Sequence, residues 1–76
     1  MVWDKRNGTK AAATLTRDED GSIVATISFI RPGYSNIRGP NAYMSVDQAR
    51  SWIFGEAARH GFGPTDFVVQ EIGEVS

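Results

Sequence analysis

Hydrophobic and polar residues alternate with a period of two in two neighbouring segments, residues 10–17 and 22–30. This period is typical of β-strands that bury one face. The acidic segment between them, residues 18–21, ends in Asp-Gly, a pair that favours tight turns. The pattern therefore predicts a β-hairpin. Its apolar side consists of Ala11, Ala13, Leu15, Ile23, Ala25, Ile27 and Phe29.

The period changes after residue 44. At roughly 100° per residue, Val46, Ala49, Ile53 and Ala57 fall on one narrow stripe, and most polar residues of the segment point away from it. This spacing predicts an amphipathic helix over residues 45–60.

The ends of this helix are also marked in the sequence. The Ser45 side chain is expected to accept a hydrogen bond from the amide of Gln48, and the Gln48 side chain to reach back to the amide of Ser45. Gly61 provides a left-handed stop, after which Phe62 can touch Ala57.

The remaining segments have weaker patterns. Residues 31–44 form a long connection interrupted by Pro-Gly and Gly-Pro pairs, within which residues 34–38 fit a short third strand. Residues 66–75 fit a closing strand, but Phe67, Val69 and Ile72 do not keep one parity. Either Val68, Gln70 and Ile72 share a face, or a bulge near residues 70–71 shifts the phase.

Together these elements predict an α+β fold, in the order β-β-(β)-α-β. An antiparallel sheet of three or four strands is expected to carry the helix on one face, the face of Leu15, Ile23, Ile27, Phe29 and Phe67. Residues 1–76 are expected to form one domain. Residues 1–9, with Trp3, are expected to be a loose arm or a short leading strand, and Trp3 either pins this arm to the core or meets a partner.

Composition limits the classes of function. A chain of 76 residues has a small core, and without cysteine neither disulfides nor thiolate metal sites contribute to it. The net charge of −1 lacks the basic excess typical of nonspecific nucleic-acid binding. No apolar run approaches ~18 residues, and the N-terminus lacks the apolar stretch of a signal peptide. A soluble cytoplasmic protein is expected.

Candidate catalytic and metal-binding residues are few. The acidic turn Asp18-Glu19-Asp20 does not fit a calcium loop, because the twelfth position counted from Asp18 is Phe29 and not a glutamate. His60, the single histidine, stands at the helix end, where the helix dipole favours positive charge. The carboxylates form no recognisable acid–base set. We therefore expect no enzyme, no metal and no cofactor.

Binding chemistry is concentrated in residues 31–44, which contain no acidic residue although the chain as a whole is slightly acidic. Arginine and tyrosine are enriched at protein interfaces, and the same side chains stack on bases and bridge phosphates in single-stranded nucleic acids. A plain third strand with half-buried tyrosines is the alternative. The candidate residues here are Arg31, Tyr34, Asn36, Arg38, Asn41 and Tyr43.

Two further groups complete the predicted partner-binding set. Trp52 and Phe54 lie at opposite edges of the buried helix stripe, where each either seals the core or anchors a partner. The acidic turn, with Asp18, Glu19 and Asp20, would attract basic residues of a partner.

The helix and the residues after it resemble a known family. Ser45-Val-Asp-Gln-Ala-Arg-Ser-Trp-Ile-Phe-Gly55, then Gly61-Phe-Gly63 and Gln70-Glu71-Ile72, are similar to a segment of a small phage anti-CRISPR family that acts on type I surveillance complexes. The likeness covers roughly the C-terminal 30 residues. It implies a compact antiparallel sheet with a helix on one face, no catalysis, and inhibition at the surface where guide RNA or target DNA is handled. The family's contact residues lie mainly outside the matching stretch, so none is transferred.

These observations favour a non-catalytic binding protein, most concretely a phage-encoded inhibitor of a bacterial type I surveillance complex that blocks target DNA recognition. One alternative is a small module that binds single-stranded nucleic acid through Arg31, Tyr34, Arg38 and Tyr43. Another is an accessory component of a phage particle. No membrane partner is expected.

Overall fold

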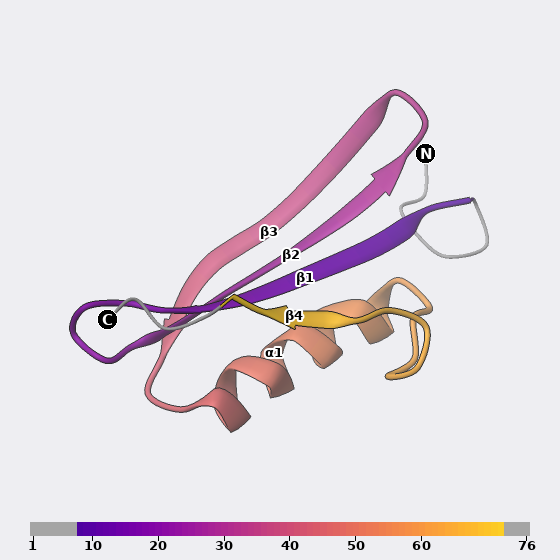
Figure 1. Ribbon diagram of the computed structural model, residues 1–76. Coiled ribbons are helices and arrows are strands. Elements are labelled where there is room, and N and C mark those ends of the chain that lie inside the picture. The colour runs from indigo at the N-terminus through magenta and orange to yellow at the C-terminus, as the bar shows by residue number, and fades with distance from the viewer. Residues whose placement is uncertain (1–7, 73–76) are drawn as a thin grey trace.

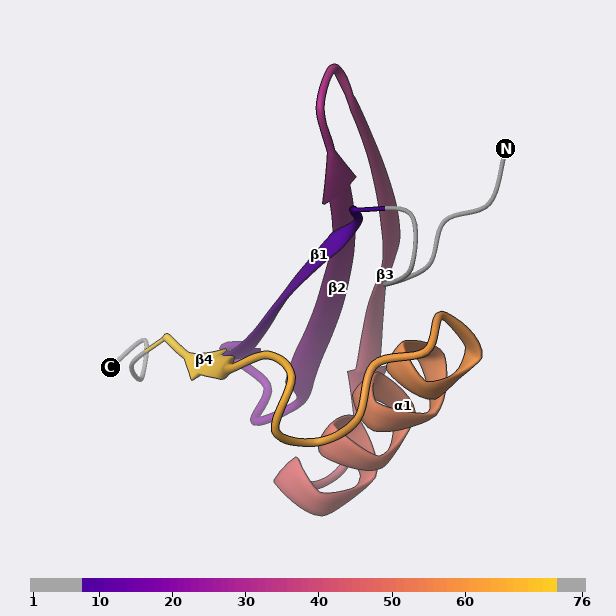
Figure 2. The ribbon, with the colours of Figure 1, turned by 90° about the vertical axis from the view of Figure 1, so that its right-hand side faces the viewer.

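The computed structural model describes residues 8–72. The N-terminal arm with Trp3 and the last part of the predicted closing strand lie outside this range. The described elements follow the order β1 (Lys10–Arg17), β2 (Ile23–Arg31), β3 (Tyr34–Tyr43), α1 (Val46–Arg59) and β4 (Val69–Glu71). Figure 1 shows the sheet as one layer, and Figure 2 shows the helix against one of its faces. The predicted α+β class and the order of elements are confirmed.

The sheet is mixed, with strand order β3-β2-β1-β4. β1 and β2 pair antiparallel, as do β2 and β3, but β4 lies parallel to β1. The expectation of a wholly antiparallel sheet is therefore wrong for the last strand. Because α1 runs back along the sheet after β3, the chain enters β4 from the same end at which β1 begins (Figure 1).

The predicted hairpin is confirmed, with pairs from Lys10↔Ile30 to Arg17↔Ile23. Its turn is closed by hydrogen bonds from the Asp18 N–H to the Ser22 carbonyl, 2.8 Å, and from the Gly21 N–H to the Asp18 carbonyl, 3.0 Å. The third strand is longer than the predicted residues 34–38. It follows a two-residue turn, Pro32-Gly33, and continues to Tyr43.

The helix has the predicted caps with one difference. Ser45 accepts a hydrogen bond from the Gln48 N–H at 3.2 Å, but the Gln48 side chain accepts one from Met44, and not from Ser45. At the other end Gly61 has a φ of 79°, and the Phe62 N–H donates to the Ala57 carbonyl at 3.0 Å. These contacts satisfy backbone groups that would otherwise lack partners at the helix ends.

The core lies between α1 and the predicted apolar side of the β1–β2 hairpin. Ile27, Phe29 and Ile53 are its largest fully buried side chains. Alanines on both layers allow the helix backbone to approach the sheet closely. The buried set is Ala13, Leu15, Ile23, Ala25, Ile27, Phe29, Ala49, Ile53, Ala57 and Phe62.

The last strand is shorter than predicted. Over Val69–Glu71 its pairing with β1 runs without a bulge, and Val69 lies opposite Ala13 on the core side. This register fits the first alternative, in which Val68, Gln70 and Ile72 share a face. The structure turns that face away from the core, and Val68 and Ile72 are exposed. Phe67 packs against the core from the preceding loop.

Candidate binding surface on strand β3

The predicted Arg, Tyr and Asn residues of the third strand lie on the same side of the sheet as α1. In antiparallel pairs, directly opposed residues point to the same face. Arg38 opposes Ile27 and Asn36 opposes Phe29, both of which are buried beneath the helix. Tyr34, two residues before Asn36, shares this side by the period of two.

A bulge in β3 keeps the later residues on this side. The register shifts between Ala25 and Ile27, so Gly39 and Pro40 together oppose a single residue. Tyr43 lies five positions after Arg38, and in a regular strand residues an odd number of positions apart point to opposite faces. Without the extra residue of the bulge, the side chain of Tyr43 would therefore point away from the helix. Instead, Tyr43 opposes the buried Ile23.

Glycine is required at the bulge. Gly39 has a φ of 96°, which favours glycine, and a Cβ added there would lie 2.7 Å from the carbonyl oxygen of Ala25. The glycine thus allows β3 to pass close to β2 where the strand changes phase. It is this local geometry that brings both halves of β3 to one surface.

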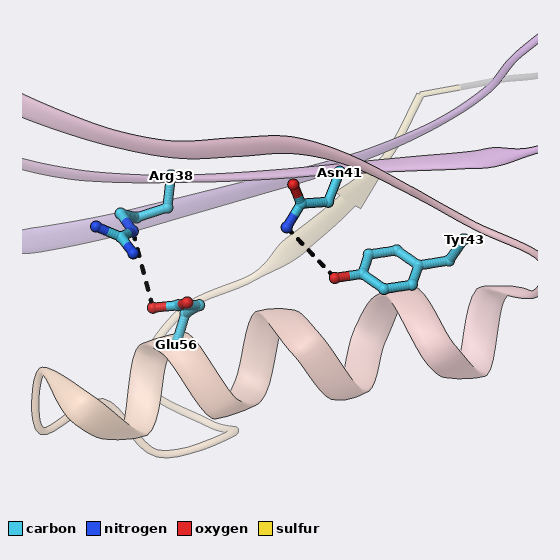
Figure 3. A network of polar contacts seen from close by, with 4 residues as sticks. All are labelled: Arg38, Asn41, Tyr43 and Glu56. Atoms are coloured by element: carbon cyan, nitrogen blue, oxygen red, sulfur yellow. Dashed lines mark hydrogen bonds and ion pairs between the residues drawn. The ribbon is translucent and has the colours of Figure 1, made fainter.

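Two polar contacts lie along the second half of β3, and one of them reaches α1 (Figure 3). The Arg38 Nε lies 4.0 Å from the Glu56 Oε2, with the arginine side chain 51% exposed and the glutamate side chain 12% exposed. The Asn41 Nδ2 donates a hydrogen bond to the Tyr43 Oη at 3.4 Å. Figure 3 shows these side chains in the space between the strand and the helix. Arg38 is therefore held at one end while much of its surface stays open to a partner.

The packing of Trp52 is what the sealing alternative predicts, although part of the residue stays exposed. It is half-buried, packs against the core, and its ring lies 6.2 Å from the ring of Tyr43. Phe54, on the other flank of α1, is 5.6 Å from Phe67. The two helix aromatics close the two sides of the core, and the part of Trp52 that remains exposed borders the strand surface.

The start of β3 is the most open part of this surface. Figure 1 shows the β2–β3 hairpin extending beyond the end of the helix. There the guanidinium of Arg31 lies 5.5 Å from the centre of the Tyr34 ring, within the range of a cation–π contact. Tyr34 as a whole residue is 62% exposed. We call the set of these residues the β3 surface: Arg31, Tyr34, Asn36, Arg38, Asn41, Tyr43 and the exposed part of Trp52.

The acidic turn lies apart from the β3 surface. Residues 18–20 are at the start of β2, whereas Arg31 and Tyr34 follow its end, about 30 Å away for a nine-residue strand. The predicted partner-binding residues therefore form two separate sites. A hydrogen bond from the Ser22 N–H to the Asp20 carboxylate, 2.9 Å, orders this turn and lowers the pKa of Asp20.

Two contacts of the structure were not expected from the sequence. Glu56 is the ion-pair partner of Arg38, a pairing between α1 and β3 for which the sequence has no local signal. His60 is the C-cap residue of α1, and its ring lies 4.0 Å from the ring of Phe29. The histidine thus contributes to the packing at the helix end.

Metal ligands and membrane segments are not found in the described part of the chain. Among residues 8–72, no three His, Cys, Asp or Glu side chains are grouped so that they could hold a metal ion. In the same residues, the helix is neither long nor apolar enough to cross a bilayer.

Comparisons with protein-family models, with curated proteins and with solved structures found no match. The function must therefore be inferred from the residues and their geometry.

Proposed function

We propose that this chain is a non-catalytic binding protein that inhibits a larger partner by occupying part of its surface. The observation that carries this proposal is the alignment of arginine, tyrosine and asparagine side chains on one side of an edge strand, the β3 surface. Residues 21–46 contain no acidic residue, so positive charge is not cancelled within this segment.

The β3 surface has physical properties suited to binding. Tyrosine and arginine supply much of the binding energy at protein interfaces. Because these side chains stand on a strand packed against a helix, less conformational entropy is lost on binding than from a free loop. Glu56 further restricts Arg38 before a partner arrives.

The partner that we propose is a bacterial type I CRISPR surveillance complex. The resemblance of the helix and the following residues to a phage anti-CRISPR family supports this choice. The protein would then act in the cytoplasm of the bacterial host and prevent recognition of target DNA. The acidic turn, about 30 Å from the β3 surface, adds a second contact for lysines and arginines that such a complex uses to hold nucleic acid.

Co-elution of the purified chain with a type I surveillance complex, followed by a target DNA binding assay, tests this proposal. We expect the wild-type chain to co-elute and to reduce DNA binding. A Tyr34→Ala, Arg38→Ala double variant should lose co-elution, whereas Arg59→Ala, an exposed arginine on the helix, should retain it. Failure of the wild-type chain to bind surveillance complexes of any type I subtype would contradict the choice of partner.

Direct binding of single-stranded nucleic acid is the second candidate. The stacking of Arg31 on the exposed Tyr34 favours it, because both groups can also stack on bases. Affinity for an oligonucleotide should then fall linearly on a log–log plot as salt rises. The absence of binding at roughly 50 mM salt would exclude this candidate.

A further inference from the structure

We propose that β3 binds an extended, acidic segment of the partner, which adds to the sheet as a new edge strand. This inference rests on the proposed function and specifies the kind of segment that the β3 surface recognises. Addition of a strand to a sheet edge uses backbone hydrogen bonds for affinity and alternate side chains for specificity.

The edge is available in the described part of the chain, residues 8–72, where β3 pairs with β2 alone. The two-residue turn makes Arg31 and Tyr34 the first pair of the ladder. The pair that closes a two-residue turn is hydrogen-bonded. Along antiparallel strands, hydrogen-bonded pairs alternate with pairs whose N–H and C=O groups point away from the partner strand. The N–H and C=O groups of Ser35 and Ile37 consequently point outward, away from β2.

The bulge defines where the added strand ends. Pro40 has no N–H to donate, and Gly39 departs from the regular strand conformation. Regular pairing is therefore confined to residues 34–38. Five residues with two outward-facing backbone positions form a short acceptor site.

The two sides of this five-residue segment differ in chemistry. On the helix side lie Tyr34 and Arg38, with Arg31 beside them on β2. On the other side Ile37 is exposed on β3 itself, whereas Ile30 lies on β2, one strand further from the free edge. Because side chains of a strand alternate between faces, the complementary segment alternates acidic and apolar residues.

A second copy of the chain fits this edge less well. Antiparallel pairing of two β3 strands would bring two sets of Arg31 and Arg38 to one interface, and residues 21–46 of the second copy would contribute no acidic residue to pair with them. Glu56 of α1 offsets part of the charge of Arg38 within each copy. Like charges across a strand pair are unfavourable. Charge complementarity thus favours an acidic partner strand over self-association.

The test uses a capped heptapeptide of alternating glutamate and valine, titrated into the isotope-labelled chain and followed by amide NMR. We expect a Kd on the order of 0.1–1 mM, with the largest shifts at residues 34–38. One control peptide has lysine for glutamate, and a second has the same composition with glutamates and valines in separate blocks. Absence of shifts with the alternating peptide, or equal shifts with the block peptide, would overturn strand addition.

Substitutions on the edge provide the matched protein controls. Ser35→Pro removes one outward N–H and should abolish peptide binding, whereas Ser35→Ala should preserve it. Arg38→Gln should weaken binding about 2- to 5-fold, and Arg59→Gln should leave it unchanged. A melting temperature close to that of the wild type shows that each variant is folded. Unchanged binding by a folded Ser35→Pro variant would also overturn the proposal.

Strand addition and the proposed function fail in different ways. If the surveillance complex is retained by Ser35→Pro but lost by the Tyr34→Ala, Arg38→Ala double variant, the β3 surface binds through side chains and strand addition is wrong. If the alternating peptide binds residues 34–38 but no surveillance complex is retained, strand addition holds and the proposed partner is wrong.

Discussion

The two faces of the sheet differ in the side chains that they carry. The face toward α1 carries the buried side chains of β1 and β2 and the arginines, tyrosines and asparagines of the β3 surface, which stand on β3 except for Arg31 at the end of β2. The opposite face is uncovered in the described structure (Figure 2). On β1, β2 and β3 it carries mostly uncharged residues, with Lys10 as a charged exception: Ala12, Thr14, Thr16, Val24, Thr26, Ser28, Ile30, Ser35, Ile37 and Ala42.

This difference shows how a small protein can place its core and a candidate binding surface on one face of its sheet. Toward β1 the helix covers apolar side chains, and toward β3 it meets polar ones such as Arg38 and Tyr43. The boundary runs along Trp52, which is half core and half surface. Side chains on the helix face are therefore expected to matter most, either for stability or for binding.

The largest expected difference in stability is between substitutions of two neighbouring residues that point to opposite faces. Phe29 is fully buried and Ile30 is 45% exposed. Phe29→Ala should lower the free energy of unfolding by about 3–5 kcal/mol, because it leaves a cavity in the core. Ile30→Ala should cost less than about 1 kcal/mol. Urea unfolding of the two variants measures this contrast. Equal costs would show that the two faces are not distinguished by burial.

A substitution at the bulge should have the next largest effect on the free energy of unfolding. Gly39→Ala should destabilise the chain by about 2–4 kcal/mol, because it combines a left-handed backbone with a clash against the Ala25 carbonyl. Gly33→Ala, at a similar φ of 82° but with no atom near the added Cβ, should cost about 1 kcal/mol. Thermal and urea unfolding compare the two. A cost for Gly39→Ala no greater than for Gly33→Ala would contradict the close approach of β3 to β2.

The cap that starts α1 should contribute a smaller amount. Ser45→Ala removes the hydrogen bond accepted from Gln48 and should lower the free energy of unfolding by about 1 kcal/mol. Ser51→Ala, an exposed position in the middle of the helix, should change it by less than about 0.5 kcal/mol. A loss of stability in Ser51→Ala equal to that in Ser45→Ala would argue against the cap.

The smallest effect concerns the acidic turn, which lies outside both faces. Because the pKa of Asp20 is lower in the folded protein, its carboxylate stabilises the folded state at pH values above the pKa in the unfolded chain, which is near 3.8. This contribution disappears as the pH falls through the lower, folded pKa. In melting curves from pH 6 to pH 2, Asp20→Asn should therefore differ from the wild type at pH 6 and approach it at the acidic end. A difference that grows toward pH 2 would have the wrong sign.

Local patterns in the sequence were sufficient to predict most of the fold. The hairpin and the helix follow from periods of two and 3.6 and from caps within a few residues, so Ser45 and Gly61 mark the helix ends. The direction of β4 was not predicted, because it depends on the path of α1 across the sheet. The sequence does not predict the full length of β3, because a Gly-Pro pair commonly ends a strand, whereas Gly39-Pro40 forms a bulge within it.

The candidate site was predicted in composition but not in arrangement. Arg31, Tyr34 and Arg38 were identified from the absence of acidic residues around them. Their common face depends on the bulge, and the partner of Arg38, Glu56, lies 18 positions further along the chain. The distance between the acidic turn and the β3 surface also depends on the fold. The acidic turn precedes β2, and the turn that leads into β3 follows it, so the two lie at opposite ends of this strand.

The central claim is that the β3 surface binds a partner, and the most direct test compares exposed residues on the two faces. The affinity of a type I surveillance complex for Tyr34→Ala and for Ile30→Ala should be measured against the wild type, with melting temperatures as a control for folding. We expect Tyr34→Ala to weaken binding by at least about 10-fold and Ile30→Ala to leave it nearly unchanged. Equal affinities of the two variants, or a larger loss for Ile30→Ala, would contradict the claim.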